Sequence, residues 1–581
     1  MSALLGRFRA AIGMLAGACL LAAAAVMPRS AQPDAPEARV DAIFAPWTGR
    51  DMPGCAAAVM EGGELLFAKG YGAANLEHDI PITPATVFHV ASVSKQFTAL
   101  AVGLLVAGGE VSWDDDIRRY VPELPDFGAP ITLRQLAHHT SGIRDQWALL
   151  QMAGWRWGGD VIRQSDVLDL LSRQTALNFS PGTDYVYSNS GYTLLAVVIE
   201  RVSGETLPAF TERRIFRPLG MTHTAFRDDH TMLVQNRAYA YARDGFGTYR
   251  LSIPDFAIAG ATSLFTTVED LARWNGNFGS GEVGGPDVLR QLEERGALSD
   301  GARLSYAFGL AHGAYRGRRT IGHGGADAGY RSEFLRFPDA DVAVAVLCNT
   351  GSADPGRLAR DIAYIFLPPP ATADVFLPPP GIAESERETA REPATEHGAT
   401  RAPRPIGRAL RPADLAGYYR RPGNDVPLRV VARGDNLALV AGGVEQPLRR
   451  LSGGRVALGG ATEVTFASAD GGAPLTLRVG DPTRPVYRRA RPVRPEPDAL
   501  AAYVGTYYSD DLAVDYSFRV EDDRLVLQNR KLGRIPLTPT FADGFYGANW
   551  YFTFRRDDSD RVSGFTVSTS RAWNIPFHKR P

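Results

Sequence analysis

Two polar side chains that together could activate a nucleophile stand three residues apart at the start of an apolar run. Ser92 and Lys95 lie in HVASVSKQFTALAVGLLVA at residues 89–107, a pattern typical of a buried helix and its first turn. Three residues are nearly one helical turn, so the side chains would share a face and could exchange a proton. A serine hydroxyl needs such a base before it attacks a carbonyl carbon. The spacing predicts acyl transfer at Ser92; an N-cap serine beside a surface lysine is the alternative.

Lysine is rare in this chain, which draws attention to Lys95. Lysine and arginine together number 63, yet lysine occurs only at positions 69, 95, 531 and 579. Arginine keeps its proton at any working pH, whereas a desolvated lysine can lose it. Lowering a lysine pKa from about 10.4 to about 7 costs roughly 4–5 kcal/mol, which burial and neighbouring charges must supply. We therefore expect a built site around Lys95.

Two further short motifs, each present once, could complete this site. YSN at 187–189 lies between a Pro-Gly turn and a long apolar helix, and HGG at 323–325 lies within strand-like sequence. The paired glycines would let a substrate approach an edge strand closely. Taken singly, the tyrosine would be structural and the histidine a turn residue, but together with Ser92 and Lys95 they favour catalysis. We expect His138 and His139 to be packing and loop residues.

Composition excludes several other classes of function. The net charge is −1, so there is no bulk electrostatic case for binding nucleic acid or an anionic membrane. The chain contains no Cys-x-x-Cys and no His-Glu-x-x-His, which predicts no metal site. It also lacks a phosphate-binding glycine run followed by lysine and the Gly-x-Ser-x-Gly of α/β-hydrolases. We expect neither a metal nor an organic cofactor.

The N-terminus reads as a secretory signal. Arg7 and Arg9 precede an alanine-rich apolar run that ends at Met27 and is followed by polar sequence, which predicts a signal peptide over residues 1–31 and a secreted or periplasmic protein. An uncleaved membrane anchor is the alternative, although the run is barely long enough to span a bilayer. We expect no stable membrane insertion after cleavage.

Cys55 and Cys348 would remain after signal removal. Both lie in strand-like runs, and buried free cysteine behaves as a small apolar residue. The sequence therefore predicts two buried, unpaired thiols in preference to a disulfide.

Strand-like sequence at both ends of a helical region predicts the main domain. A hairpin at 55–71 opens the region, helical segments follow, and successive strands occupy 321–350. This order fits an α/β sandwich over residues 38–367 that is closed by its first and last segments.

The rest of the chain contains a linker and an internal repeat. Residues 368–408 are rich in proline, alanine and charge, which is typical of a linker. Residues 415–440 and 503–529 share a Gly-x-Tyr opening and two strands separated by a charged turn. We expect two small antiparallel β-barrel domains, at 409–490 and 498–581.

Ser-x-x-Lys, Tyr-x-Asn and His-x-Gly, each present once and in this order, resemble the motifs of the serine β-lactamase and penicillin-binding protein superfamily. The resemblance covers roughly residues 40–367, including FHVASVSKQFTA, LAHHTSGI and YSNSGY, and points to the branch with class C β-lactamases, DD-peptidases, family VIII esterases and D-aminopeptidases. It implies a β-lactamase/transpeptidase-like α/β sandwich. The paired β domains resemble the C-terminal lipocalin-like modules of D-aminopeptidase-type members.

The resemblance also implies roles for the motif residues. Ser92 would form an acyl-enzyme, with Lys95 or the Tyr187 phenolate as base and Tyr187 returning the proton to the leaving group. Asn189 would orient Lys95 and the substrate.

The third motif would supply the substrate-binding edge. His323 stands where many relatives carry lysine, which weakens the case for strong carboxylate recognition because a neutral imidazole replaces a fixed cation. Gly325 would lie at the site, and the backbone N–H groups of Ser92 and Ala326 would form the oxyanion hole.

We therefore predict a serine hydrolase that cleaves an amide or ester of a small-molecule or peptide substrate, in the manner of a D-aminopeptidase, DD-peptidase or esterase. A β-lactamase, or a penicillin-binding sensor without turnover, is the alternative. In the D-aminopeptidase case a loop of the C-terminal modules would reach the site. No oligomeric state follows from the sequence.

Overall fold

The structure is a computed structural model. It describes residues 35–367, 411–421, 423–441, 444–450, 456–458, 462–467, 475–479 and 486–581. The predicted signal peptide (1–31) and linker (368–408) lie outside the described residues.

A six-stranded antiparallel sheet is the centre of the first unit, in the order β12-β13-β14-β15-β1-β2. Its strands are β1 (Cys55–Glu61), β2 (Glu64–Tyr71), β12 (Ala311–Tyr315), β13 (Arg318–Asp327), β14 (Tyr330–Phe337) and β15 (Val342–Cys348). The N-terminal hairpin pairs with the last strand of the unit, β1 against β15. The predicted α/β sandwich closed by its first and last segments is confirmed.

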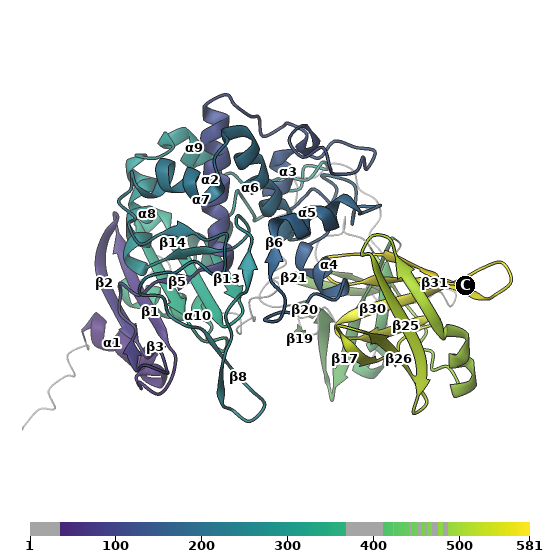
Figure 1. The fold of residues 1–581 in the computed structure, drawn as a ribbon. Helices are drawn as coiled ribbons and strands as arrows, with labels where there is room; N and C mark the ends of the chain where they lie inside the picture. The colour runs from purple at the N-terminus through teal and green to yellow at the C-terminus, as the bar shows by residue number, and fades with distance from the viewer. Residues whose placement is uncertain are drawn as a thin grey trace, which may run out of the picture.

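Helices cover both faces of this sheet (Figure 1). Alternate residues of β1 point to opposite sides, so Ala57 and Val59 pack in one apolar core while Ala56 and Ala58 pack in the other. The first core is closed by α1 (Pro36–Phe44) and α10 (Pro355–Phe366). The other helices of the first unit pack in the second core: α2 (Ser94–Ala107), α3 (Leu133–Ala137), α4 (Gln146–Met152), α5 (Gln164–Ser172), α6 (Asn189–Ser203), α7 (Leu207–Thr211), α8 (Val268–Ser280) and α9 (Gly285–Leu292). Helix α11 (Pro412–Leu415) belongs to the core of the first β unit.

Helix α2 runs through the middle of the second core. Its residues from Ser94 to Leu105 are all buried, because the segment is apolar or small on every side. Helix α6 packs against it and ends at Gly204, whose φ of 72° is the left-handed conformation that glycine supplies at a helix end. The two helices present Lys95 and Asn189 from their N-terminal turns.

Cys55 and Cys348 form a disulfide, so the prediction of unpaired thiols is wrong. They are direct partners in the β1–β15 ladder, with their Cα atoms 4.0 Å apart. The two residues are separated by 293 positions in the sequence, and nothing in either run indicates that the two strands are neighbours.

The two C-terminal β units are barrel-shaped, as predicted (Figure 1). The first is a closed eight-stranded barrel of β16 (Gly417–Arg421), β17 (Asn424–Arg433), β18 (Asn436–Ala441), β19 (Val444–Arg450), β20 (Val456–Leu458), β21 (Thr462–Ala467), β22 (Thr476–Val479) and β23 (Tyr487–Arg489). The second is a nine-stranded sheet of β24 (Gly505–Ser509), β25 (Val514–Glu521), β26 (Arg524–Asn529), β27 (Gly533–Pro536), β28 (Thr538–Pro539), β29 (Gly544–Gly547), β30 (Trp550–Arg556), β31 (Val562–Ser568) and β32 (Ile575–Lys579).

The sequence repeat is structural as well. Gly417 and Gly505 open the first strands of the two units with nearly equal φ values, 147° and 145°, which residues with a side chain rarely adopt. Two residues later, Tyr419 and Tyr507 each donate a hydrogen bond to the carbonyl four residues earlier. The shared Gly-x-Tyr therefore gives the first strand of both units the same backbone conformation and the same tyrosine hydrogen bond.

Candidate active site

Ser92 and Lys95 face one another across a tight turn. Ser92 lies in a 3₁₀ turn, Ala91–Val93, directly before α2, and Lys95 is the second residue of α2. Ser92 is therefore not in the helix itself, but its Oγ is 3.0 Å from Lys95 Nζ, as the spacing predicted.

Lys95 is completely buried, and three oxygen atoms surround its amine. Nζ lies 2.8 Å from Asn189 Oδ1, 2.8 Å from the Ala261 carbonyl oxygen and 3.0 Å from Ser92 Oγ. The first two oxygens can only accept, so when the amine is neutral they take its two N–H groups and leave its lone pair toward the Ser92 hydroxyl. Burial lowers the Lys95 pKa well below its usual value. Ser92 therefore has a base in contact with it.

Asn189 is held by a buried aspartate that the sequence analysis missed. Asp145 Oδ2 accepts hydrogen bonds from the backbone N and the Nδ2 of Asn189, at 2.7 and 2.8 Å. Its other oxygen accepts from Trp147 N at 3.1 Å and caps α4. Since the Asn189 amide group donates to Asp145, its oxygen is aimed at Lys95.

Tyr187 lies against the same amine. The centroid of its ring is 4.9 Å from Lys95 Nζ and 5.0 Å from the guanidinium carbon of Arg571. Its hydroxyl oxygen is buried. Burial raises the pKa of the phenol, while an interaction with Ser92 and the charge of Arg571 lower it. The structure thus brings together the hydroxyl, the amine and the phenol of the prediction.

His139 supports Tyr187 from behind. It is buried, its backbone has a φ of 59°, and its Nδ1 accepts a hydrogen bond from Ser188 N at 3.2 Å. Its ring lies 4.2 Å from the Tyr187 ring and 4.6 Å from the Tyr306 ring, between centroids. Burial lowers the His139 pKa well below its usual value. His139 is a packing residue, and what it packs is the phenol beside Ser92.

His323 makes hydrogen bonds to the protein through both ring nitrogens. Nδ1 lies 2.5 Å from the Gly324 carbonyl oxygen, and Nε2 lies 2.9 Å from the Tyr306 hydroxyl. A carbonyl can only accept, so Nδ1 carries the proton and Nε2 accepts from the tyrosine in the neutral ring. The His323 ring centroid is 6.2 Å from that of Tyr187, so the third motif joins the cluster.

Gly325 lets strand β13 touch the turn that carries Ser92. A Cβ at this position would lie 2.3 Å from the Val90 carbonyl oxygen and 3.2 Å from the Ala91 Cβ. Ser332 Oγ on the next strand donates to the same carbonyl at 2.8 Å. Ala326, the next residue of β13, therefore lies in a strand that packs against the turn carrying Ser92. The predicted oxyanion hole needs this arrangement.

A second carboxylate lies at the edge of the cluster. Asp327 Oδ2 accepts a hydrogen bond from Thr262 Oγ1 at 2.8 Å and lies 3.8 Å from His89 Nε2. Burial raises the Asp327 pKa to about 6, and its charge acts on Lys95.

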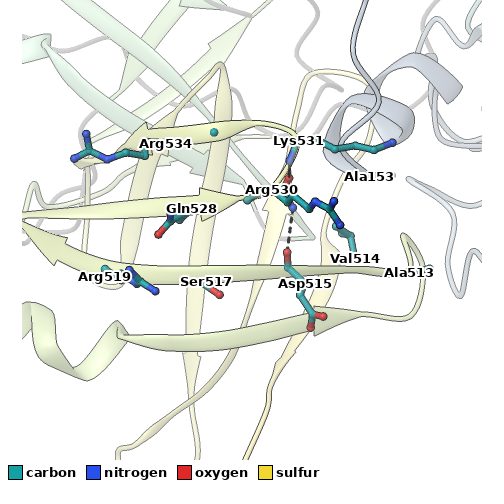
Figure 2. A pocket seen from close by; sticks show the side chains of 12 residues that line it. Ala153, Ala513, Val514, Asp515, Ser517, Arg519, Gln528, Arg530, Lys531 and Arg534 are labelled. Carbon is teal, nitrogen blue, oxygen red and sulfur yellow. Dashed lines mark hydrogen bonds between the residues drawn. The ribbon is translucent and has the colours of Figure 1, made fainter. Parts of the chain in front are cut away.

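We also searched the described residues for a metal site, a groove and a membrane-spanning helix. Within the part of the chain that the structure describes, no three His, Cys, Asp or Glu side chains are grouped as metal ligands. A groove of about 790 Å³ on the second β unit is lined by residues of β25 to β27 and by Ala153 (Figure 2). It contains none of the motif residues.

Of the helices described, none is long and apolar enough to cross a membrane.

Three functional candidates carried no sequence motif: Asp145, Asp327 and Arg571. The first could have been found as an N-cap before the apolar segment QWALLQM. The other two have no comparable signal, because their neighbours in the site come from distant parts of the chain.

Sequence comparisons match part of this chain to known proteins. The family model described as "Beta-lactamase" matches residues 40–366. A D-aminopeptidase of Gluconobacter oxydans (strain 621H) is 32% identical over 319 residues, which are 55% of this chain and 59% of that protein. A D-aminopeptidase of Cereibacter sphaeroides (strain KD131 / KCTC 12085) is 30% identical over 299 residues, 51% of this chain and 57% of the relative. The chain thus spans less than two thirds of the length of these relatives.

The fold is also found among solved structures, and one example has a TM-score above 0.5. It is that of an octameric penicillin-binding protein homologue from Pyrococcus abyssi, with a TM-score of 0.51 and 21% sequence identity. The match covers 86% of this chain and 98% of the solved chain.

Proposed function

Because the chain belongs to the beta-lactamase family, we propose that it is a serine hydrolase that cleaves amide bonds through an acyl-enzyme on Ser92, as a D-aminopeptidase does. The names of its relatives support the substrate class. The observation that carries the proposal is the contact between Ser92 and the buried amine of Lys95, whose pKa is lowered by burial. An amine with a lowered pKa beside a serine hydroxyl is the kind of base that acyl transfer requires.

The first half of the reaction forms the acyl-enzyme. Ser92 Oγ attacks the substrate carbonyl carbon while its proton passes to Lys95, directly or through Tyr187. The negative charge on the carbonyl oxygen is held by the N–H groups of Ser92 and Ala326. Each such donor contributes about 10² to 10³ in rate.

The second half releases the products. The C–N bond breaks as the leaving nitrogen takes a proton from Tyr187, which is replenished from Lys95. A water molecule then attacks the acyl carbon and gives a proton to the same pair of groups. This pair passes the proton to Ser92 Oγ as the bond between Oγ and the acyl carbon breaks, which releases the acid. Asp145 supports both steps because it aims the Asn189 oxygen at Lys95.

The same proposal includes a secreted or periplasmic location. The N-terminal signal pattern supports it, and so does the Cys55–Cys348 disulfide, since such bonds persist in oxidising compartments.

We also propose that the C-terminal units are lipocalin-like. The first of them supports this, because it is an eight-stranded barrel in which strands that are consecutive in the sequence are neighbours.

Substitutions at the two central residues test the chemistry. Ser92→Ala should abolish labelling by an acylating probe and hydrolysis of D-alaninamide. Lys95→Arg should lower kcat/KM about 10² to 10⁴-fold, because a guanidinium does not accept the proton. Lys69→Arg is the matched control, because Lys69 is partly exposed and forms an ion pair with Asp41. The kcat/KM of this variant should stay within about twofold of that of the unsubstituted protein. Labelling of Ser92→Ala at another serine would refute the proposal.

A substrate panel separates the alternatives. D-alaninamide, L-alaninamide, a p-nitrophenyl ester and nitrocefin should be compared on one preparation. We expect the D-amide to be turned over fastest. Turnover of nitrocefin alone would favour a β-lactamase, and product stopping at one equivalent would favour a sensor without turnover.

A further inference from the structure

An arginine of the second β unit stands at the candidate active site. Arg571 lies in the turn between β31 and β32, and its guanidinium carbon is 5.0 Å from the centroid of the Tyr187 ring. Lys95 Nζ lies 4.9 Å from the same centroid. The two residues are 476 positions apart in the sequence, yet both contact one phenol.

The turn that carries Arg571 is fixed to the first unit through its backbone. The Arg571 carbonyl accepts hydrogen bonds from Asn178 Nδ2 at 2.9 Å and from Asp145 N at 3.1 Å. Trp573 N donates to Asn178 Oδ1 at 2.8 Å, and the Trp573 side chain is buried. The position of the arginine is therefore set by the interface and not by a mobile surface turn.

Two of the other basic groups around Tyr187, Lys95 and His139, do not offer a fixed positive charge. Burial lowers the pKa of both Lys95 and His139 well below their usual values. His323 uses both ring nitrogens for hydrogen bonds to Tyr306 and Gly324. Arginine keeps its charge at any working pH, so Arg571 supplies the permanent cation among the described groups that contact the ring.

We propose that Arg571 determines specificity by binding the terminal carboxylate of the amino acid that leaves, so that the preferred substrates are short peptides with a free carboxyl end. This rests on the proposed function, in which Tyr187 protonates the leaving nitrogen, because Arg571 contacts the ring of the group that gives up that proton. In a dipeptide the carboxylate is one carbon removed from that nitrogen. A guanidinium matches it with two parallel N–H donors.

A matched pair of substrates isolates this contact. D-Ala-D-Ala and D-Ala-D-Ala amide differ only in the terminal group. We expect the protein to prefer the free carboxylate by about 10 to 100-fold in kcat/KM, the usual range for a charge-assisted hydrogen bond. Arg571→Gln should remove this preference, mainly through KM. The readout is the ratio of kcat/KM between the two peptides, because the Arg571 charge also acts on Lys95 and Tyr187 and its loss affects both peptides alike. Arg571→Lys should retain part of the preference, since lysine keeps the positive charge but lacks the two parallel N–H donors of the guanidinium.

Arg580→Gln is the control, because Arg580 lies on the same β unit, half exposed and paired with Asp515. It should leave the preference unchanged. Melting temperatures of the variants exclude unfolding as the cause. Equal losses on both peptides in Arg571→Gln, or no preference in the unsubstituted protein, would overturn the proposal.

Binding to a Ser92→Ala variant separates this proposal from the proposed function. Calorimetric titration with the two peptides needs no turnover, so it reports on Arg571 even if the chemistry has been assigned wrongly. Tighter binding of the free carboxylate that disappears in Ser92→Ala/Arg571→Gln supports the proposal. Equal binding of the two peptides refutes it.

Discussion

Lys95 is surrounded by charges of both signs, and their balance decides when its amine can accept a proton. Burial is the largest influence and lowers its pKa, and Arg571 acts in the same direction. Asp145 and Asp327 raise it. Asp327 has a pKa of about 6 because it is buried, so it is negatively charged at neutral pH.

Asp327→Asn should therefore shift the acidic limb of the pH profile of kcat/KM to lower pH. The negative charge of Asp327 stabilises protonated Lys95, so its removal lets the amine lose its proton at lower pH, where it can then act as base. The profile should be recorded between pH 4 and pH 9. Asp339→Asn, at an exposed acid paired with Arg319, should leave the profile in place. A shift of the acidic limb to higher pH in Asp327→Asn would contradict this reading of the charges.

At the scale of elements, the site is the contact between β13 and the turn before α2. Ala91 in that turn has a φ of 46°, a conformation unfavourable for a residue with a side chain. The surrounding structure maintains it: Ser332 binds the Val90 carbonyl, and Gly325 leaves the room that this close approach needs. The element contact thus sets where the N–H of Ser92 points.

Gly325→Ala should reduce kcat about 10² to 10³-fold, the effect of losing one oxyanion donor. Its methyl group would overlap the Val90 carbonyl oxygen and push β13 away from the turn. Steady-state kinetics and a melting curve should be measured together. Gly279→Ala, with open space around the added Cβ in α8, should change neither. A Gly325→Ala protein with unaltered kcat would show that the strand does not form the oxyanion site.

At the scale of the whole molecule, the second β unit is joined to the first unit by a buried ion pair. Arg144 and Asp511 are 2.8 Å apart, and their side chains are 1% and 0% exposed. Gln174 and Thr175 add hydrogen bonds to the same aspartate. Arg144 directly precedes Asp145, so one residue binds the β unit and its neighbour orients the amide group of Asn189.

Asp511→Ala should lower the stability of the protein by about 3–5 kcal/mol, because it leaves the Arg144 charge buried without this partner. Arg144→Met/Asp511→Leu should recover most of that loss, since an apolar pair of similar volume replaces two desolvated charges. Urea unfolding and kcat/KM should be compared for both. Asp515→Ala, at an exposed pair with Arg580, should cost no more than about 1 kcal/mol. A double variant as unstable as Asp511→Ala would contradict the prediction.

The sequence by itself determined the parts of this protein that depend on short spacing. Three patterns describe local geometry: the three-residue interval between Ser92 and Lys95, the paired glycines of HGG in β13, and the repeated Gly-x-Tyr. The chain folds locally as these patterns predict. The alternation of small apolar residues in β1 likewise fixes its two buried faces.

Only the tertiary structure decided which distant groups meet. The partner of Cys55, the acid behind Asn189 and the arginine over Tyr187 come from positions 348, 145 and 571. Periodicity along a segment shows which face is buried, but it does not show which other segment covers that face. Long-range pairing depends on packing of the whole chain, and the charges that govern Lys95 are set at that level.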